Sequence, residues 1–217
     1  DLGGRPKTTR SSTELRWLTL LDDVVTASGA VERLRTKLRA NDAWADLPIS
    51  ERAIRVVHGV LEAGPLRARI AHWDDMQLAH RELLDDGVPH WLSRALPEGA
   101  SIDYAEIEEL AMEVTRSRFP VGPLDELWSM LVVSRLAELF EVLEVAGIVT
   151  WHDQVTRPDP YSVTPSIVSG SFSLTPLGRA AMVDPVRSAG YTFPTIDDLT
   201  EADGLTLVHA VVSGSLD

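Results

Sequence analysis

The chain has 217 residues, of which 44% are hydrophobic and 24% are charged, proportions typical of a folded protein rather than a disordered one. It contains no cysteine, which excludes disulfide bonds, iron–sulfur clusters, cysteine-ligated zinc sites and a thiol nucleophile. The formal net charge of -13 at pH 7 disfavours general binding to nucleic acids, whose phosphates repel a surface of the same sign.

This charge is unevenly distributed along the chain. Residues 1–40 contain eight lysines and arginines against five acidic residues, a net charge of +3, so the remaining residues carry -16. Because phosphates attract cations, any contact with nucleic acid is expected within the first 40 residues.

Within this basic segment, a helix is predicted over residues 13–28. Apolar side chains recur there at helical spacing, and Gly29 provides a natural end. The predicted buried stripe of this helix consists of Leu15, Leu18, Leu21, Val24 and Val25.

Cationic side chains alternate with others just after this helix, which predicts one or two short strands. Four cations would face the same side of a strand: Arg33, Arg35, Lys37 and Arg39. Alternate strand residues are about 6.5–7 Å apart, close to the phosphate repeat of a nucleic-acid strand, so these four residues are the candidate nucleic-acid contact. The alternative is a solvated strand whose cations deter pairing with other strand edges.

The middle of the chain, residues 48–98, is predicted to be a helical connector. Ser50 is its expected N-cap, and breaks are expected near Gly64–Pro65 and between Gly87 and Pro89. The main predicted boundary is Pro97-Glu98-Gly99. The expected organisation is an N-terminal segment 1–47, the connector 48–98, a domain 99–185 and a C-terminal extension 186–217, in which residues 195–212 would cover the domain or mediate pairing.

The domain 99–185 is predicted to be mainly α with a short β-hairpin, and Trp128 and Trp151 are expected in its core. We expect three helices first: one from Ser101, its cap, to Arg116, one over 124–130 and one over 133–146. A strand over 148–155, a Pro- and Ser-rich stretch over 157–170 and a strand over 172–175 should follow. A short helix that begins at Pro176 ends the domain.

Two segments of this domain resemble parts of a known family. LFEVLEVAGIVTW, residues 139–151, is a predicted helix that ends at glycine and turns into an apolar strand, and FSLTPLGRAAM, residues 172–182, is a strand that leads through Leu-Thr-Pro-Leu-Gly into a helix. In this order, after two helices, they resemble the recognition helix, hairpin and closing helix of bacterial winged-helix proteins. Residues 13–40 resemble a second, shorter copy that lacks the Leu-Thr-Pro-Leu-Gly closure.

The resemblance extends to uncharacterised bacterial proteins with tandem winged-helix modules and implies winged helix-turn-helix modules joined by a helical connector. Where such modules bind DNA, their third helix needs donors for bases and phosphates. Here that predicted helix carries Arg135 but also Glu138, Glu141 and Glu144, which would share much of one exposed face and repel phosphates. The favoured interpretation is a solvated acidic face, the next is a contact for a basic protein partner, and the least favoured is direct DNA binding by this module.

No catalytic or phosphate-binding motif is apparent, and no pair of histidines has metal-binding spacing, so no cofactor and no enzyme activity are expected. The first residue is not methionine, so the chain is expected to belong to a longer protein. We therefore expect a cytoplasmic, non-enzymatic module that assembles with a protein partner, with other domains of the full-length chain or with a second copy. The alternative is a DNA-associated regulator that uses residues 33–39, and no membrane contact is expected because no long apolar run occurs.

Overall fold

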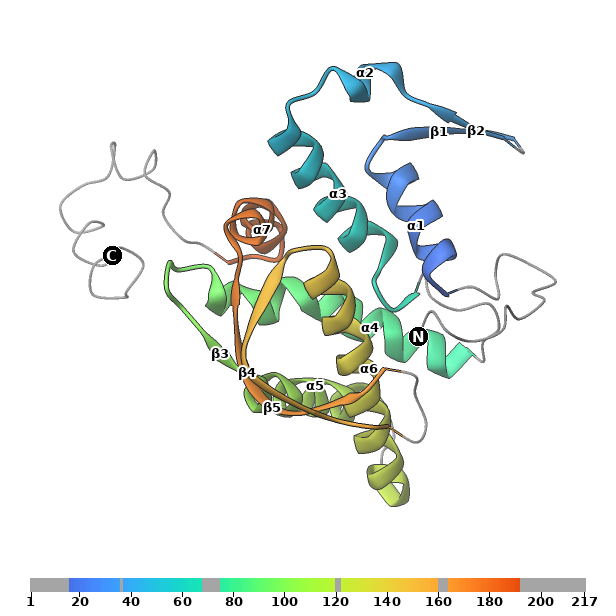
Figure 1. Ribbon diagram of the computed structural model, residues 1–217. Helices are drawn as coiled ribbons and strands as arrows, with labels where there is room; N and C mark the ends of the chain where they lie inside the picture. Colours follow the sequence, from blue (N-terminus) through green and yellow to red (C-terminus); the bar gives the residue numbers. More distant parts are fainter. Residues whose placement is uncertain (1–15, 36, 68–74, 120–121, 160–163, 192–217) are drawn as a thin grey trace. The chain divides into compact units, whose positions relative to one another are not determined.

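The computed structural model describes residues 16–35, 37–67, 75–119, 122–159 and 164–191, and the fold there is mainly helical with two small antiparallel sheets (Figure 1). This confirms the predicted mixture of helices and short hairpins. The chain divides into two compact units, Asp1–Asp85 and Asp86–Asp217, with the division inside one helix. The predicted four-part organisation stays a prediction, and residues 195–212 lie outside the described residues.

The first unit is built around two helices, α1 (Arg16–Ala27) and α3 (Ile49–Ala63), which pack against each other (Figure 1). Its other elements are β1 (Val31–Leu34), β2 (Lys37–Ala40), α2 (Asp42–Ala45) and the first part of α4 (Asp75–Leu92). A glycine allows the close packing, since a Cβ on Gly59 would lie 2.8 Å from the carbonyl oxygen of Val24. The N-cap position of α3 is Pro48, which has no side-chain cap, so the prediction of Ser50 as N-cap was wrong and Ser50 lies inside the helix.

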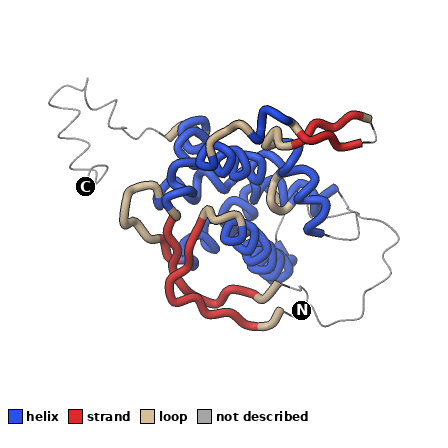
Figure 2. Tube along the Cα trace, turned by 45° about the horizontal axis from the view of Figure 1, so that its top comes forward, coloured by secondary structure: helices blue, strands red, loops and turns tan. Residues whose placement is uncertain are grey.

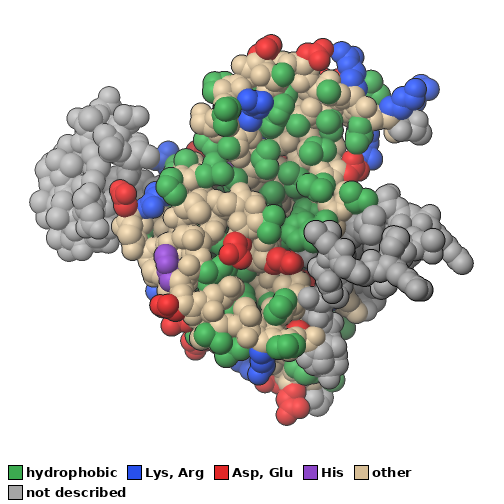
Figure 3. All heavy atoms as spheres, viewed as in Figure 1, with side chains coloured by type: hydrophobic (Ala, Val, Ile, Leu, Met, Phe, Trp, Pro, Cys, Tyr) green, Lys and Arg blue, Asp and Glu red, His purple; other side chains and the backbone are tan. Residues whose placement is uncertain are grey.

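The buried side of α1 differs from the predicted stripe. Leu20 and Val24 are buried, whereas Leu18 and Leu21 are 45% and 51% exposed. Of the predicted stripe, Val24 is buried, Val25 is half-buried, Leu18 and Leu21 are exposed, and Leu15 lies outside the described residues. Figure 3 shows hydrophobic side chains gathered on the surface around α1 and α3.

The loop after α3 is held by two residues of α4. Both carboxylate oxygens of Asp85 accept backbone hydrogen bonds, one from Leu66 N–H at 2.9 Å and one from Arg67 N–H at 3.0 Å. The buried Arg81 guanidinium donates to the carbonyl oxygen of Leu66 at 3.2 Å. Burial raises the pKa of Asp85 to about 6, against the lowering effect of these N–H groups and of the two nearby arginines.

Helix α4 continues past the predicted break between Gly87 and Pro89 and ends at Leu92. A proline inside a helix removes one backbone donor. Here the helix persists because buried side chains flank the proline on both sides, namely Leu84, Val88, Trp91 and Leu92. The predicted break near Gly64–Pro65 is confirmed, since α3 ends at Ala63 with Gly64 at a φ of 76°.

The second unit contains a three-stranded sheet and the longest described helix. After the 3-10 turn η3 (Ser93–Ala95), its elements are β3 (Ile102–Asp103), α5 (Tyr104–Arg118), the 3-10 turn η4 (Gly122–Leu124), α6 (Asp125–Val145), β4 (Val149–Arg157), β5 (Ser166–Leu174) and α7 (Pro176–Ser188). The strand order is β3-β5-β4, all antiparallel. In Figure 2 the β4–β5 hairpin forms a long, curved ribbon.

Three local predictions for this unit are corrected. The cap of α5 is Asp103, whose side chain accepts from Ala105 N–H at 2.9 Å, rather than Ser101. The helices predicted over 124–130 and 133–146 are one continuous helix, because no glycine or proline interrupts Asp125–Val145. Strand β5 begins at Ser166, six residues before the predicted start, because it pairs along the length of β4.

The core of the second unit is aromatic. The rings of Tyr104, Phe140, Trp151 and Phe172 contact one another with centroid distances of 4.7–5.9 Å. Trp128 is 3% exposed and stacks on Phe119. Trp128 and Trp151 thus pack against residues of other elements, as predicted, with Trp128 buried and Trp151 half-buried.

The two segments that carried the family resemblance contact each other through Thr175. Its hydroxyl donates to the carbonyl oxygen of Gly147 at 2.5 Å and accepts from Gly178 N–H at 2.9 Å, while its own N–H donates to Ile148. A Cβ on Gly178 would lie 2.0 Å from the Ile148 carbonyl oxygen. Leu-Thr-Pro-Leu-Gly is therefore a cap that joins the start of α7 to the end of α6.

Candidate functional site

The basic segment 31–40 forms the hairpin β1–β2, as predicted, but its cations do not share one face. Arg33 pairs with Leu38, and Glu32 pairs with Arg39 across the hairpin. Paired residues lie on the same face of an antiparallel sheet. The side chain of Arg33 is therefore on one face of the hairpin, and those of Lys37 and Arg39 are on the other face. Arg35 lies in the turn with a φ of 53°. The expectation of a single four-cation face was wrong because the chain reverses between β1 and β2, which pair antiparallel with Leu34 beside Lys37.

One of the four cations is already neutralised. Arg33 forms an ion pair with Asp22 of α1. Lys37 and Arg39 are exposed on a strand whose four residues are all exposed. This leaves Lys37 and Arg39 as the two cations available on one face of the hairpin.

The predicted acidic face of α6 is not present. Glu138 is 2% exposed, and Arg135 donates to both of its carboxylate oxygens at 3.0 and 3.1 Å. Glu141 accepts from the hydroxyl of Thr164 at 2.9 Å, and only Glu144 is exposed. The expectation failed because residues 136–140 are all buried, so the middle of α6 has no solvent face on which Glu138 could lie.

The first half of α6, together with the turn before it, carries an exposed apolar stripe that we did not predict. Leu124, Leu127 and Met130 are 49%, 45% and 47% exposed and follow one another at three-residue intervals. Such spacing places side chains on one face of a helix. The signal is present in the sequence, but it resembles an ordinary buried stripe.

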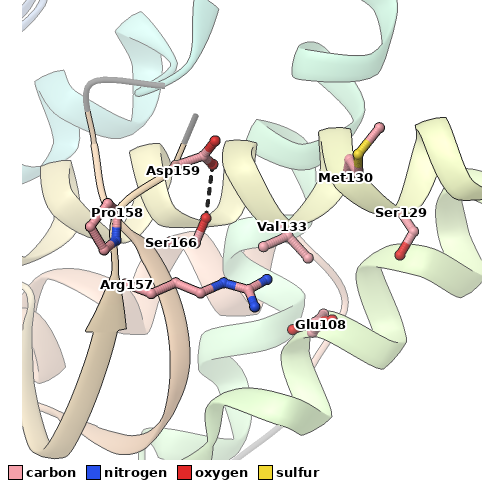
Figure 4. A pocket seen from close by; sticks show the side chains of 8 residues that line it. All are labelled: Glu108, Ser129, Met130, Val133, Arg157, Pro158, Asp159 and Ser166. Atoms are coloured by element: carbon pink, nitrogen blue, oxygen red, sulfur yellow. Dashed lines mark hydrogen bonds between the residues drawn. The ribbon is translucent and has the colours of Figure 1, made fainter. Parts of the chain in front are cut away.

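This stripe leads to a pocket between α5, α6 and the β4–β5 hairpin (Figure 4). The pocket has a volume of about 510 Å³ and is lined by Glu108, Ser129, Met130, Val133, Arg157, Pro158, Asp159 and Ser166. Helices α5 and α6 supply one carboxylate and an apolar wall, and the hairpin supplies charged and hydroxyl groups. Volumes of this order are typical of ligand sites, about 300–1,000 Å³.

The charges in the pocket are incompletely paired. Figure 4 shows the side chain of Arg157 pointing toward Glu108. Burial raises the pKa of Glu108, and the positive charge of Arg157 opposes that rise. Among the described residues, neither side chain makes a hydrogen bond or an ion pair with the other or with a third residue. Asp159, by contrast, accepts from the hydroxyl of Ser166 at 2.8 Å.

The pocket belongs to the acidic part of the protein. Residues 86–217 contain seven arginines, no lysine and 20 acidic residues, a net charge of -13. Residues 1–85 contain 13 cationic and 13 acidic residues, so they contribute no net charge. The whole net charge of the protein is therefore carried by the unit that contains the pocket and the apolar stripe.

The described residues were compared with two general requirements, those of a metal site and those of a membrane-spanning helix. No group of three or more histidine, aspartate or glutamate side chains there is arranged to bind a metal ion. No helix in the described ranges combines the length and the apolar character needed to cross a bilayer. A scan against protein-family models matched none, and searches of curated proteins and of solved structures found no match either.

Proposed function

We propose that the second unit contains a winged-helix module that binds another protein, rather than DNA, through the first half of α6 and the adjoining pocket. The order of elements supports a winged-helix arrangement. Three helices, namely the end of α4, α5 and α6, precede the β4–β5 hairpin, and α7 closes the unit. In this assignment α6 is the third helix and the hairpin is the wing, although the three helices differ from those expected from the sequence.

The exposed apolar stripe is the observation that carries the proposed protein contact. Leu127 and Met130 on α6, and Leu124 in the turn before it, are each about half exposed, whereas most other apolar residues of α6 are buried. The cores of protein–protein interfaces are apolar, and methionine is enriched there, whereas charged residues are depleted. Exposed apolar side chains grouped on one face mark such contacts.

The same half of α6 lacks what a DNA contact needs. Between Asp125 and Ser134 the helix contains two acidic residues and no lysine or arginine. Base edges and phosphates are contacted mainly by arginine, lysine, asparagine and glutamine. Arg135 follows, but its guanidinium is paired with the buried Glu138. An α6 that entered the major groove would thus bring carboxylates to the phosphates.

Selection of a displayed random-peptide library on the full chain tests this proposal. We expect the library to yield peptides that bind the wild-type chain. Their affinity for the Leu127→Asp variant should be about tenfold lower, because a charge in the apolar stripe must be desolvated on binding. Ile49→Asp is the matched control, since Ile49 is an aliphatic residue 78% exposed in the other unit. Selection of no peptide, or equal sensitivity to both substitutions, would contradict the proposed function.

A second candidate function, binding to nucleic-acid phosphates, rests on the exposed hairpin. Lys37 and Arg39 lie on one face of β2 and are exposed. In a duplex titration at low and moderate salt, Lys37→Ala combined with Arg39→Ala is expected to weaken binding and to reduce the salt dependence by about two released counterions. Arg55→Ala in α3, which removes an exposed cation outside the hairpin, is the control. Absence of binding to any duplex at low salt would exclude this function.

A further inference from the structure

We infer that the pocket between α5, α6 and the β4–β5 hairpin takes the side chain of a lysine or arginine of the protein partner. The cationic head would lie beside Glu108, and the alkyl stem would pack on Met130 and Val133. This inference rests on the proposed function and specifies the chemistry of the partner.

The lining of the pocket matches the two parts of such a side chain. Met130 and Val133 are one helical turn apart on α6 and form an apolar wall, and Glu108 approaches from α5 (Figure 4). Lysine and arginine combine an apolar stem with a charged head, so they fit a wall of this kind that ends at a carboxylate. The volume of about 510 Å³ exceeds that of a single side chain and leaves room for neighbouring atoms of the partner.

Glu108 lacks a contact that a bound cation would supply. Its carboxylate is half-buried and makes no hydrogen bond or ion pair among the described residues. A partly desolvated carboxylate without a donor is costly, and a cation within hydrogen-bond distance offsets that cost. The interaction of Arg157 with Glu108 is electrostatic, without a hydrogen bond or an ion pair. The position beside the carboxylate is therefore open to a ligand.

The charge of the surroundings favours a cation over an anion. The lining has two carboxylates, Glu108 and Asp159, against one guanidinium, that of Arg157. The unit around it has a net charge of -13. A field of this sign attracts basic partners and repels acidic ones during association. An acidic peptide could form a favourable ion pair with Arg157 alone and would be repelled by the net negative charge of the unit.

The inference is tested by titrating the full chain with N-acetyl-lysine methylamide and following backbone amide shifts by NMR. We expect the shifts to concentrate at Glu108, Met130 and Val133. N-acetyl-norleucine methylamide has the stem without the charge, and N-acetyl-glutamate methylamide has the opposite charge. Both are expected to bind at least about tenfold more weakly. Uniform small shifts with the lysine probe, or equal affinity for the norleucine probe, would overturn the inference.

Three substitutions sharpen the test. Glu108→Gln keeps the shape of the side chain and is expected to lower the affinity for the lysine probe by about tenfold. Arg157→Ala is expected to raise that affinity, because it removes a competing cation. Glu109→Gln makes the same charge change at an exposed neighbour outside the pocket and should have no effect. Equal loss in Glu108→Gln and Glu109→Gln, or weaker binding in Arg157→Ala, would contradict a cation site.

Failure of this inference is distinguishable from failure of the proposed function. Displayed peptides that bind through Leu127 but are insensitive to Glu108→Gln would leave the protein contact intact and exclude the cation pocket. A library that yields no binding peptide would remove the proposed function itself. Thermal melts of each variant, followed by circular dichroism, identify any substitution that acts by unfolding the unit.

Discussion

Replacing Gly178 with alanine is expected to destabilise the second unit by about 3 kcal/mol, because the new Cβ would lie 2.0 Å from the carbonyl oxygen of Ile148 and 2.8 Å from its carbonyl carbon. Helix propensity alone predicts the opposite sign, since alanine is favoured over glycine inside a helix by about 1 kcal/mol. The contact is with backbone, so no side chain can rotate away. The helix start would have to shift and would weaken the Thr175 cap.

Urea unfolding followed by tryptophan fluorescence and circular dichroism measures this effect. Ala180→Ser, at an exposed position of the same helix, is the control and should change the free energy of unfolding by no more than about 0.5 kcal/mol. A Gly178→Ala variant as stable as the wild type would show that α7 does not approach Ile148 as closely as described. It would also remove the physical explanation of the Leu-Thr-Pro-Leu-Gly segment.

Replacing Asp85 with alanine is expected to lower the free energy of unfolding of the first unit by about 2–4 kcal/mol. The change leaves the backbone N–H groups of Leu66 and Arg67 without their acceptor, and each buried unsatisfied donor costs about 1–3 kcal/mol. Leu66 is fully buried, so water cannot replace the carboxylate there. Asp86→Ala, one residue further along the same helix and exposed, is the control.

The loss caused by Asp85→Ala should depend on pH. The folded-state pKa of Asp85, raised to about 6 by burial, lies above its unfolded value of about 3.9. The folded protein therefore binds this proton more tightly, and the stability contributed by Asp85 decreases as the pH rises from about 4 to about 6. Denaturation at about pH 5.5 and about pH 8 should show a smaller loss at the higher pH, by about 1 kcal/mol. A loss that grows with pH would mean that the N–H donors outweigh burial.

The hairpin of the first unit separates what local pattern predicts from what it leaves open. Alternation of side chains predicted strands over 31–39, and strands form there. The face of each cation depended on where the chain turns. In the observed register, odd-numbered residues of β1 share a face with even-numbered residues of β2, so Arg33 and Arg39 lie on different faces.

Helix α6 shows the same division in the second unit. Most of its residues were predicted to be helical from the spacing of apolar side chains, although as two helices, and the end at Gly147 was predicted from the glycine. The burial of Glu138 could not be predicted. The spacing of the three glutamates shows that they share much of one helix face, but it does not show whether another element covers that face. The pocket also depended on distant segments, since Glu108, Val133 and Arg157 come from three different elements.

Secondary-structure type and the glycine- and threonine-based ends of helices follow from the amino-acid sequence alone, because backbone sterics and capping act within a few residues. Leu-Thr-Pro-Leu-Gly is of this kind, and it was recognisable before its contact with Gly147 was known. The packing of helices and strands far apart in the chain decides the rest. It determines which faces are buried, which charges are paired and where a cavity remains. For this reason Glu138, which was predicted on an exposed face, is buried, whereas Leu127 and Met130, which the sequence did not single out, are about half exposed.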